Sequence, residues 1–326
     1  MHRRHLLQLL GLAPAMATLS AAAPAAAGAS FKSIELRLRG AKDLARRALV
    51  LMPQGGEAAT APLPVALLLH GYGPTTPWQA VRMWRDHYGV AQAHRRLTEK
   101  QLGAERLRYL RTARGDELER RLAERPYRGL VLVCPETVVP YSRRPRAALF
   151  DRYADWIAET LLPELGKRVP VATAAAQTGL CGVSMGGYVG LELWLRRPDL
   201  FSAFCGLQSD IKTKAAPEYA DRIRDAIARV GERRLRLVTS RRDPYRKANQ
   251  LLNEELAARS VPSELIVASG PHNAAWMRQV GSVEALFWLD RVLHPTAATA
   301  PLPNAGDGSS GKADEIARAP SVGPVL

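Results

Sequence analysis

Cysteine is scarce in this chain: only Cys134, Cys181 and Cys205 occur among 326 residues. Each lies inside a short apolar run that predicts a buried strand, where free cysteine behaves as a small hydrophobic residue. The spacing fits no metal-binding pattern and provides no disulfide framework, although one disulfide stays open as the less favoured alternative. The sequence therefore argues against a small cysteine-stapled domain and against a cysteine-ligated metal.

Lysine is also rare, with only eight of the 46 basic residues, while Asp and Glu number 31 and the formal net charge is +15. Such a charge can indicate nucleic-acid binding. Here the arginines are spread through predicted helices beside Glu and Asp. A solvated basic surface is therefore favoured, and we expect no nucleic-acid partner, while anionic substrates and membrane surfaces stay open.

The apolar stretch near the amino terminus has the features of an export signal. Residues 2–5 form a basic region, residues 6–12 begin an apolar stretch that continues in alanine, and residues 25–29 offer small-residue cleavage sites. Its prolines argue against a stable membrane span, and no cysteine is present for a lipid anchor. Arg3 and Arg4 also resemble a twin-arginine signal, so the export route stays open. We expect a cleaved signal peptide over residues 1–29 and a periplasmic or secreted protein.

Short apolar runs alternate with amphipathic segments along the rest of the chain, which indicates an α/β fold with a mostly parallel sheet. Eight strands are predicted, over residues 34–38, 48–52, 64–70, 129–134, 179–183, 203–207, 235–239 and 264–268. Helices are predicted over residues 152–165, 185–197, 244–259 and 283–293. These elements predict one domain over residues 30–294, followed by a tail over 295–326 whose composition is typical of disorder.

A long insertion separates the third and fourth predicted strands, where one helix would ordinarily suffice. Residues 78–126 are helical in composition and rich in Arg and Glu, with Gly103 and Gly115 as expected breaks. Because the insertion leaves from the carboxyl end of a strand, it could cover an active-site mouth as a lid. The alternative is a helical excursion on the surface.

Gly182-x-Ser184-x-Gly186 has the spacing of a nucleophile elbow. An apolar strand precedes it and a helical segment follows, so Ser184 would lie on a tight turn with its hydroxyl exposed. The pattern by itself is weak, since chance would place it in roughly one chain in ten of this length. The assignment of Ser184 as a nucleophile therefore requires that the sequence also supply a base, an acid and a second oxyanion donor in suitable places.

His272 is the best-placed base, because it follows the last predicted strand at the sheet edge that Ser184 should occupy. His87 and His94 lie in the insertion as expected surface groups, and His70, which ends a strand and precedes a glycine, is expected to be structural at the oxyanion turn. Asp243 follows the preceding strand and is the favoured acid. It could instead cap a helix that starts at Pro244, and Asp210 is the alternative acid.

The second oxyanion donor should come from the loop after the third strand, where His70-Gly71-Tyr72-Gly73 occurs. We predict the backbone N–H groups of Tyr72 and Met185 as the two donors of the oxyanion hole.

Several segments resemble the putative-esterase family of the α/β-hydrolase superfamily, which includes esterase D-type enzymes and mycolyltransferases. The resemblance runs from about residue 48 to residue 293 and is carried by segments 67–73, 155–164, 182–188, 197–201, 243–245 and 270–276. It implies an α/β-hydrolase fold, with helices on both faces of the sheet, and a triad of Ser184, Asp243 and His272. The chain departs from the family in its long basic insertion and in Pro271, where glycine is common.

The expected activity is that of an exported serine esterase acting on small-molecule or polymer esters through an acyl-enzyme, with no metal and no organic cofactor. An acyltransferase that uses the same acyl-enzyme is one alternative. A non-catalytic binding protein with a hydrolase fold is another, because folds do not fix function.

Overall fold

The computed structural model describes residues 30–40, 44–54, 62–74, 76–102, 107–141 and 146–294. The predicted signal peptide and tail lie outside these residues, as does Gly103. The strands are β1 (Ser30–Arg37), β2 (Arg47–Gln54), β3 (Leu63–Leu69), β4 (Val131–Pro135), β5 (Val171–Ala172), β6 (Thr178–Val183), β7 (Ala203–Leu207), β8 (Arg234–Arg242) and β9 (Glu264–Pro271). The helices are α1 (Pro77–Asp86), α2 (Val90–Glu99), α3 (Thr112–Glu124), α4 (Arg146–Trp156), α5 (Leu162–Arg168), α6 (Met185–Arg196), α7 (Ala216–Val230), α8 (Arg246–Ala258), α9 (Ala274–Trp276) and α10 (Ser282–Leu293).

Eight strands follow one another across the sheet in the order β1-β2-β4-β3-β6-β7-β8-β9, and the two-residue β5 pairs with β3 beside this path. The pairs β1–β2 and β2–β4 are antiparallel, and every other pair along the path is parallel. The prediction of an α/β fold with a mostly parallel sheet is therefore confirmed. Strand β5 was not predicted, because two residues are too short to produce a periodic signal.

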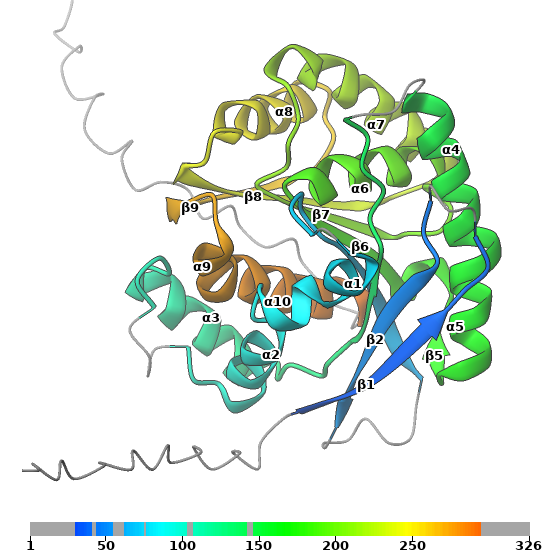
Figure 1. Ribbon diagram of the computed structural model, residues 1–326. Helices are drawn as coiled ribbons and strands as arrows, with labels where there is room; N and C mark the ends of the chain where they lie inside the picture. The colour runs from blue at the N-terminus through cyan, green and yellow to red at the C-terminus, as the bar shows by residue number, and fades with distance from the viewer. Residues whose placement is uncertain are drawn as a thin grey trace, which may run out of the picture.

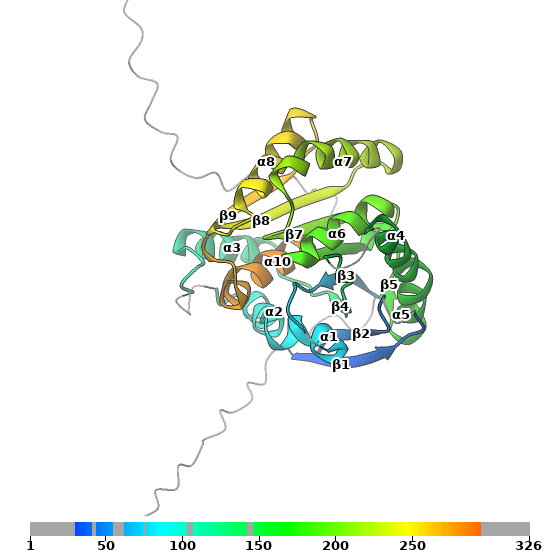
Figure 2. The same cartoon turned by 45° about the horizontal axis from the view of Figure 1, so that its top comes forward.

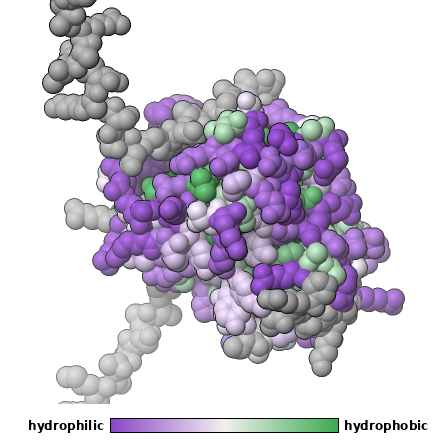
Figure 3. Space-filling model, turned by 90° about the horizontal axis from the view of Figure 1, so that it is seen from above, coloured by the Kyte–Doolittle hydropathy of each residue, from purple (hydrophilic) through white to green (hydrophobic). Residues whose placement is uncertain are grey.

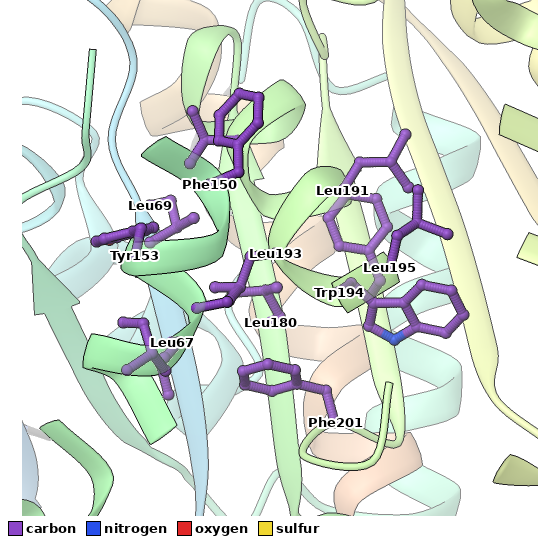
Figure 4. Packing of buried hydrophobic residues seen from close by; sticks show 14 of the residues in the cluster. Leu67, Leu69, Phe150, Tyr153, Leu180, Leu191, Leu193, Trp194, Leu195 and Phe201 are labelled. Atoms are coloured by element: carbon purple, nitrogen blue, oxygen red, sulfur yellow. The ribbon is translucent and has the colours of Figure 1, made fainter. Parts of the chain in front are cut away.

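Helices cover both faces of the sheet (Figures 1 and 2), and the side chains of β3 show why. Val65, Leu67 and Leu69 belong to one buried cluster, with side chains of α4 to α8. Ala66 and Leu68 belong to a second cluster, with side chains of α1, α2, α3 and α10. Successive strand residues point to opposite faces, so a continuous apolar run is required where both faces are buried. Figure 4 shows part of the first cluster around Leu67 and Leu69.

The insertion forms α1, α2 and α3, which pack on the same face of the sheet as α10. Leu118 and Leu122 of α3 are fully buried. Arg114 of α3 also donates two hydrogen bonds to the carboxylate of Glu284 on α10, at 2.7 and 2.8 Å. The insertion is thus part of the layer that covers this face.

Two details of the insertion differ from the prediction. Gly115 lies within α3 rather than at a break, because it belongs to the buried face of that helix together with Leu118 and Leu122. His94 is 3% exposed and not a surface group: its ring packs 4.4 Å from the ring of Phe31 and 5.5 Å from that of Tyr127. Burial lowers the pKa of His94 to about 4. His87 is exposed, as predicted.

Helix α7 was missed although its sequence carries the signals. Tyr219, Ile223 and Ala226 repeat at helical spacing on its buried face, Pro217 stands in the first turn, and Gly231 follows the last residue.

The face of the molecule in Figure 3 is largely hydrophilic, with only scattered hydrophobic residues. Among the described residues, no helix has the length and apolar character needed to cross a membrane.

Candidate active site

Ser184 lies on the turn between β6 and α6, with φ 55° and ψ −119°. This backbone conformation is strained for a residue with a side chain, and close packing maintains it. A Cβ on Gly182 would lie 2.1 Å from the carbonyl oxygen of Gly186, and one on Gly186 would lie 2.4 Å from that of Leu69. Only glycine at these two positions lets strand, turn and helix approach this closely, which explains the Gly-x-Ser-x-Gly pattern physically.

The structure brings the three predicted triad residues into one hydrogen-bonded chain. The Nε2 of His272 lies 3.0 Å from the Oγ of Ser184, and its Nδ1 lies 2.8 Å from the Oδ1 of Asp243. The carboxylate of Asp243 is fully buried, whereas the side chain of His272 is 24% exposed. The arrangement suits proton transfer from the hydroxyl of Ser184 to the imidazole of His272, whose orientation is fixed by Asp243.

Further contacts fix the carboxylate of Asp243. The hydroxyl of Thr239 donates to Oδ2 at 2.5 Å, and the backbone N–H of Tyr245 donates to Oδ1 at 3.1 Å. The helix that follows starts at Arg246 with Tyr245 as its N-cap, so the alternative of Asp243 as N-cap of a helix beginning at Pro244 is wrong.

Asp210 faces other partners. Its carboxylate accepts hydrogen bonds from the hydroxyl of Tyr141 at 2.5 Å and from the Nζ of Lys212 at 2.9 Å. Its backbone N–H donates to the carbonyl of Ser184. Asp210 thus lies next to the serine turn, but Asp243 is the acid in contact with His272.

The loop that carries His272 follows β9 and is held by polar contacts. Gly270 has φ +111°, a conformation that favours glycine, and its carbonyl accepts a hydrogen bond from the hydroxyl of Ser240 at 2.7 Å. The carbonyl of Pro271 accepts one from the amide of Gln208, and the side chain of Asn273 caps the short helix α9. Pro271 is the last residue of β9, which lies at the edge of the described sheet, where a residue without a backbone N–H is tolerated.

The two predicted oxyanion donors flank Ser184. Met185 is the first residue of α6, where backbone N–H groups have no partner within the helix. Tyr72 follows Gly71, and a Cβ on Gly71 would lie 3.4 Å from the Cβ of Ser184. Among the described residues, no acceptor is paired with the N–H of Tyr72. Within the described part of the chain, both N–H groups are therefore left without an acceptor, beside the serine.

Several residues that support the site were not predicted, notably Thr239, Thr137 and Tyr88. Thr239 lies four residues before Asp243, so its position near the carboxylate could have been suspected. Thr137 and Tyr88 contact the turn at His70-Gly71 from distant parts of the chain, and no local pattern signals such contacts.

Within the described ranges, no three His, Cys, Asp or Glu side chains are grouped so that they could hold a metal ion. Cys134, Cys181 and Cys205 are buried and free, as expected.

The family model described as putative esterase matches residues 135–285, which include all three triad positions. This match confirms the resemblance to that family and the prediction of a carboxylic-ester hydrolase. No match was found among curated proteins.

Solved structures with a similar fold include S-formylglutathione hydrolase from Staphylococcus aureus, at 16% identity and a TM-score of 0.53, covering 81% of this chain and 98% of that one. A ferulic acid esterase has 16% identity and a TM-score of 0.57, with coverage of 81% and 99%. The feruloyl esterase module from Clostridium thermocellum, solved with sinapinate, has 13% identity and a TM-score of 0.57, with coverage of 84% and 92%. At these identities the likeness shows the α/β-hydrolase fold alone.

Proposed function

We propose that this carboxylic-ester hydrolase, a relative of the putative-esterase family, cleaves esters through an acyl-enzyme on Ser184. The observation that carries the proposal is the continuous hydrogen-bonded chain from Ser184 through His272 to Asp243. Serine is a weak nucleophile until a base removes its proton, and this chain supplies the base together with a group that orients it.

In the first half-reaction the Oγ of Ser184 attacks the ester carbonyl carbon while the Nε2 of His272 takes the hydroxyl proton. The carbonyl oxygen becomes an oxyanion, which the N–H groups of Tyr72 and Met185 stabilise. The C–O bond to the alcohol then breaks, His272 returns the proton to the leaving alkoxide, and the acyl group stays on Ser184. Water repeats these steps in the second half-reaction and releases the acid. Asp243 stays ionised and stabilises the imidazolium in both.

The surface beside Ser184 favours an ester with an aromatic or bulky apolar group. Tyr72, Val139 and Tyr141 are the exposed large apolar side chains of the described residues, at 69%, 38% and 41%. Tyr72 and Tyr141 contact each other edge to face at 5.7 Å between ring centroids. They lie on the loops after β3 and β4, near the serine turn. Two of the similar structures are named as ferulic acid or feruloyl esterases, which agrees with an aromatic substrate.

A test of the substrate class compares Tyr141→Ala with Tyr109→Ala on a cinnamate ester and a butyrate ester. Loss of the Tyr141 ring should lower kcat/KM for the aromatic ester by about tenfold, equivalent to about 1.4 kcal/mol, and affect the butyrate ester less. Tyr109 is packed against Gly270, so its variant controls for general disturbance of the site. Equal losses on both esters would count against an aromatic subsite.

The experiment that tests the serine mechanism is labelling with a fluorophosphonate probe, which reacts with activated serines. The wild-type chain should be labelled at Ser184, and Ser184→Ala should not be labelled while keeping its melting temperature. A folded wild-type protein that resists the probe would contradict the mechanism. Product analysis with and without an added alcohol separates hydrolysis from acyl transfer, because only a transferase would form the new ester in preference to the acid.

We also propose that the protein is exported to the periplasm or beyond, supported by the basic and apolar residues at positions 2–12 and the small residues at 25–29. Expression of the full chain, followed by amino-terminal sequencing of the mature form, tests this. A mature protein that begins within a few residues of position 30 supports export, and an uncleaved chain retained in the cytoplasm would contradict it.

A further inference from the structure

We infer that His70 is a positioning residue that sets the direction of the peptide between Gly71 and Tyr72, whose N–H is the proposed oxyanion donor. This inference rests on the proposed function of the site. It assigns His70 a role in oxyanion stabilisation that is exerted through the backbone, without contact to the substrate.

The hydrogen bonds of His70 define its tautomer. Its Nε2 lies 3.0 Å from the backbone nitrogen of Thr137, and a backbone N–H can only donate, so Nε2 carries the lone pair. Its Nδ1 lies 2.8 Å from the carbonyl oxygen of Gly71, and a carbonyl can only accept, so Nδ1 carries the proton. Burial lowers the pKa of His70 to about 4, which keeps the ring neutral at physiological pH. Both partners therefore require the same neutral form.

The proton on Nδ1 determines where the next N–H points. The carbonyl of Gly71 and the N–H of Tyr72 belong to one planar peptide unit, and in a trans peptide they point in opposite directions. With the carbonyl turned toward the His70 ring, the N–H of Tyr72 must turn away from it. A rotation of this unit would withdraw the donor and offer a carbonyl oxygen to the developing oxyanion, which would repel it.

The surroundings hold His70 itself in place. The side chain is 3% exposed, and the backbone N–H of His70 donates to the Oγ1 of Thr137 at 2.9 Å. The loops after β3 and β4 are thus joined by two reciprocal bonds between His70 and Thr137. Strands β3 and β4 are neighbours in the sheet, so the two bonds between His70 and Thr137 connect the turn to both strands.

The helical insertion contacts the same turn at the N–H of Gly71. The hydroxyl of Tyr88, which follows α1, accepts a hydrogen bond from the N–H of Gly71 at 3.3 Å. Tyr88 is 6% exposed, and its ring packs edge to face against Trp84 at 5.4 Å. Its carbonyl accepts a bond from the hydroxyl of Ser282 at 2.7 Å. Gly71 is therefore held on both its N–H and its C=O side.

The test uses two isosteric replacements that each keep one half of the imidazole. In His70→Asn the side-chain amide can reach the position of Nδ1 and still donate to Gly71, whereas His70→Gln reaches the position of Nε2 and keeps only the contact with Thr137. We expect His70→Asn to keep kcat within about tenfold of wild type. His70→Gln and His70→Ala should lower kcat about a hundredfold or more with KM nearly unchanged, as for loss of an oxyanion donor. His87→Asn, at an exposed histidine, is the matched control.

A second readout separates positioning from general damage. A boronic acid that forms a tetrahedral adduct on the serine should bind His70→Gln more weakly by the same factor as kcat falls, while a ground-state ester analogue should bind equally. A folded His70→Ala with wild-type kcat overturns the inference, and so does an equal loss in the Asn and Gln variants. If the His70 variants do not fold, the 15N chemical shifts of the His70 ring in the wild-type protein decide: a protonated Nδ1 with an unprotonated Nε2 supports the inference, and the opposite tautomer or a charged ring overturns it.

These outcomes are distinct from failure of the serine mechanism. In that case the wild-type protein itself would not react with the fluorophosphonate probe. A labelled wild-type enzyme whose rate is insensitive to replacement of His70 would leave the mechanism standing and reject only the role of His70.

Discussion

Replacing Asp243 by Asn removes the negative charge behind His272 while leaving the shape of the side chain unchanged. The outcome depends on which way the amide turns. The N–H of Tyr245 and the Nδ1 of His272 both face the Oδ1 position, at 3.1 and 2.8 Å. The hydroxyl of Thr239 faces Oδ2 and can accept as well as donate.

The amide oxygen should therefore occupy the Oδ1 position, because an NH2 group there would confront the N–H of Tyr245. His272 then keeps its proton on Nδ1 and its lone pair toward Ser184, and only the charge is lost. A carboxylate and an imidazolium about 4 Å apart between centres attract each other by about 4 kcal/mol at an effective dielectric constant of about 20. The Asn dipole retains part of this, so the barrier should rise by about 3 kcal/mol, which lowers kcat about a hundred- to thousandfold.

The assay is steady-state hydrolysis of one ester by wild type, Asp243→Asn, Asp210→Asn and Asp225→Asn, an exposed control beside Arg224. Asp210→Asn should cost much less than Asp243→Asn, because its carboxylate contacts Tyr141 and Lys212. The assignment of the acid would be refuted by full activity in Asp243→Asn together with its loss in Asp210→Asn. A loss of about 10⁴-fold or more in Asp243→Asn would refute the orientation of the amide, since it would indicate the wrong histidine tautomer.

Two further predictions concern stability. Glu284 is fully buried between two arginines; burial raises its pKa, but the arginines outweigh burial and the net shift is downward. Glu284→Gln should lower the free energy of unfolding by about 3 to 5 kcal/mol in urea, against less than about 1 kcal/mol for the exposed Glu124→Gln; similar values for the two would contradict this. Below pH 6.5 the unfolded chain protonates histidines that stay neutral in the fold, because burial lowers the pKa of His70 and His94 to about 4. Stability should therefore fall between pH 7.5 and 4.5, by about 2 to 3 kcal/mol for each histidine. Burial raises the pKa of Asp290 to about 6, so this group adds to the free energy of unfolding as the pH falls. Its contribution about cancels the loss expected from one of the histidines. Urea titrations at both pH values measure the net loss, and a protein more stable at pH 4.5 would contradict it.

The candidate site was largely readable from the sequence because its parts follow strands. An elbow combines a strand, a tight turn and a helix within a few residues, so Gly182-x-Ser184-x-Gly186 carries its own local signal. The carboxyl ends of parallel strands meet at one edge of the sheet, which is why His272 could be assigned from its position after the last strand. The same rule could not separate Asp243 from Asp210, since both follow strands at that edge.

The insertion was only partly predictable. Its helical character followed from composition, but the partner of its apolar positions is α10, far along the chain. The sequence therefore predicts a helix break at Gly115 and a surface position for His94. In the structure both residues lie inside helices, and His94 is buried in the core. The hypothesis that the insertion acts as a lid stays a prediction.

The sequence alone determined the fold class, the nucleophile turn and its candidate base, because strand periodicity and the geometry of tight turns are encoded by neighbouring residues. Tertiary structure alone decided which acid faces His272, and it alone revealed that Thr137 and Tyr88 hold the oxyanion turn at which the sequence had already placed His70 as a structural residue. These contacts join residues that are far apart in the chain, and they depend on side-chain directions that only the packed sheet and its two helical layers define.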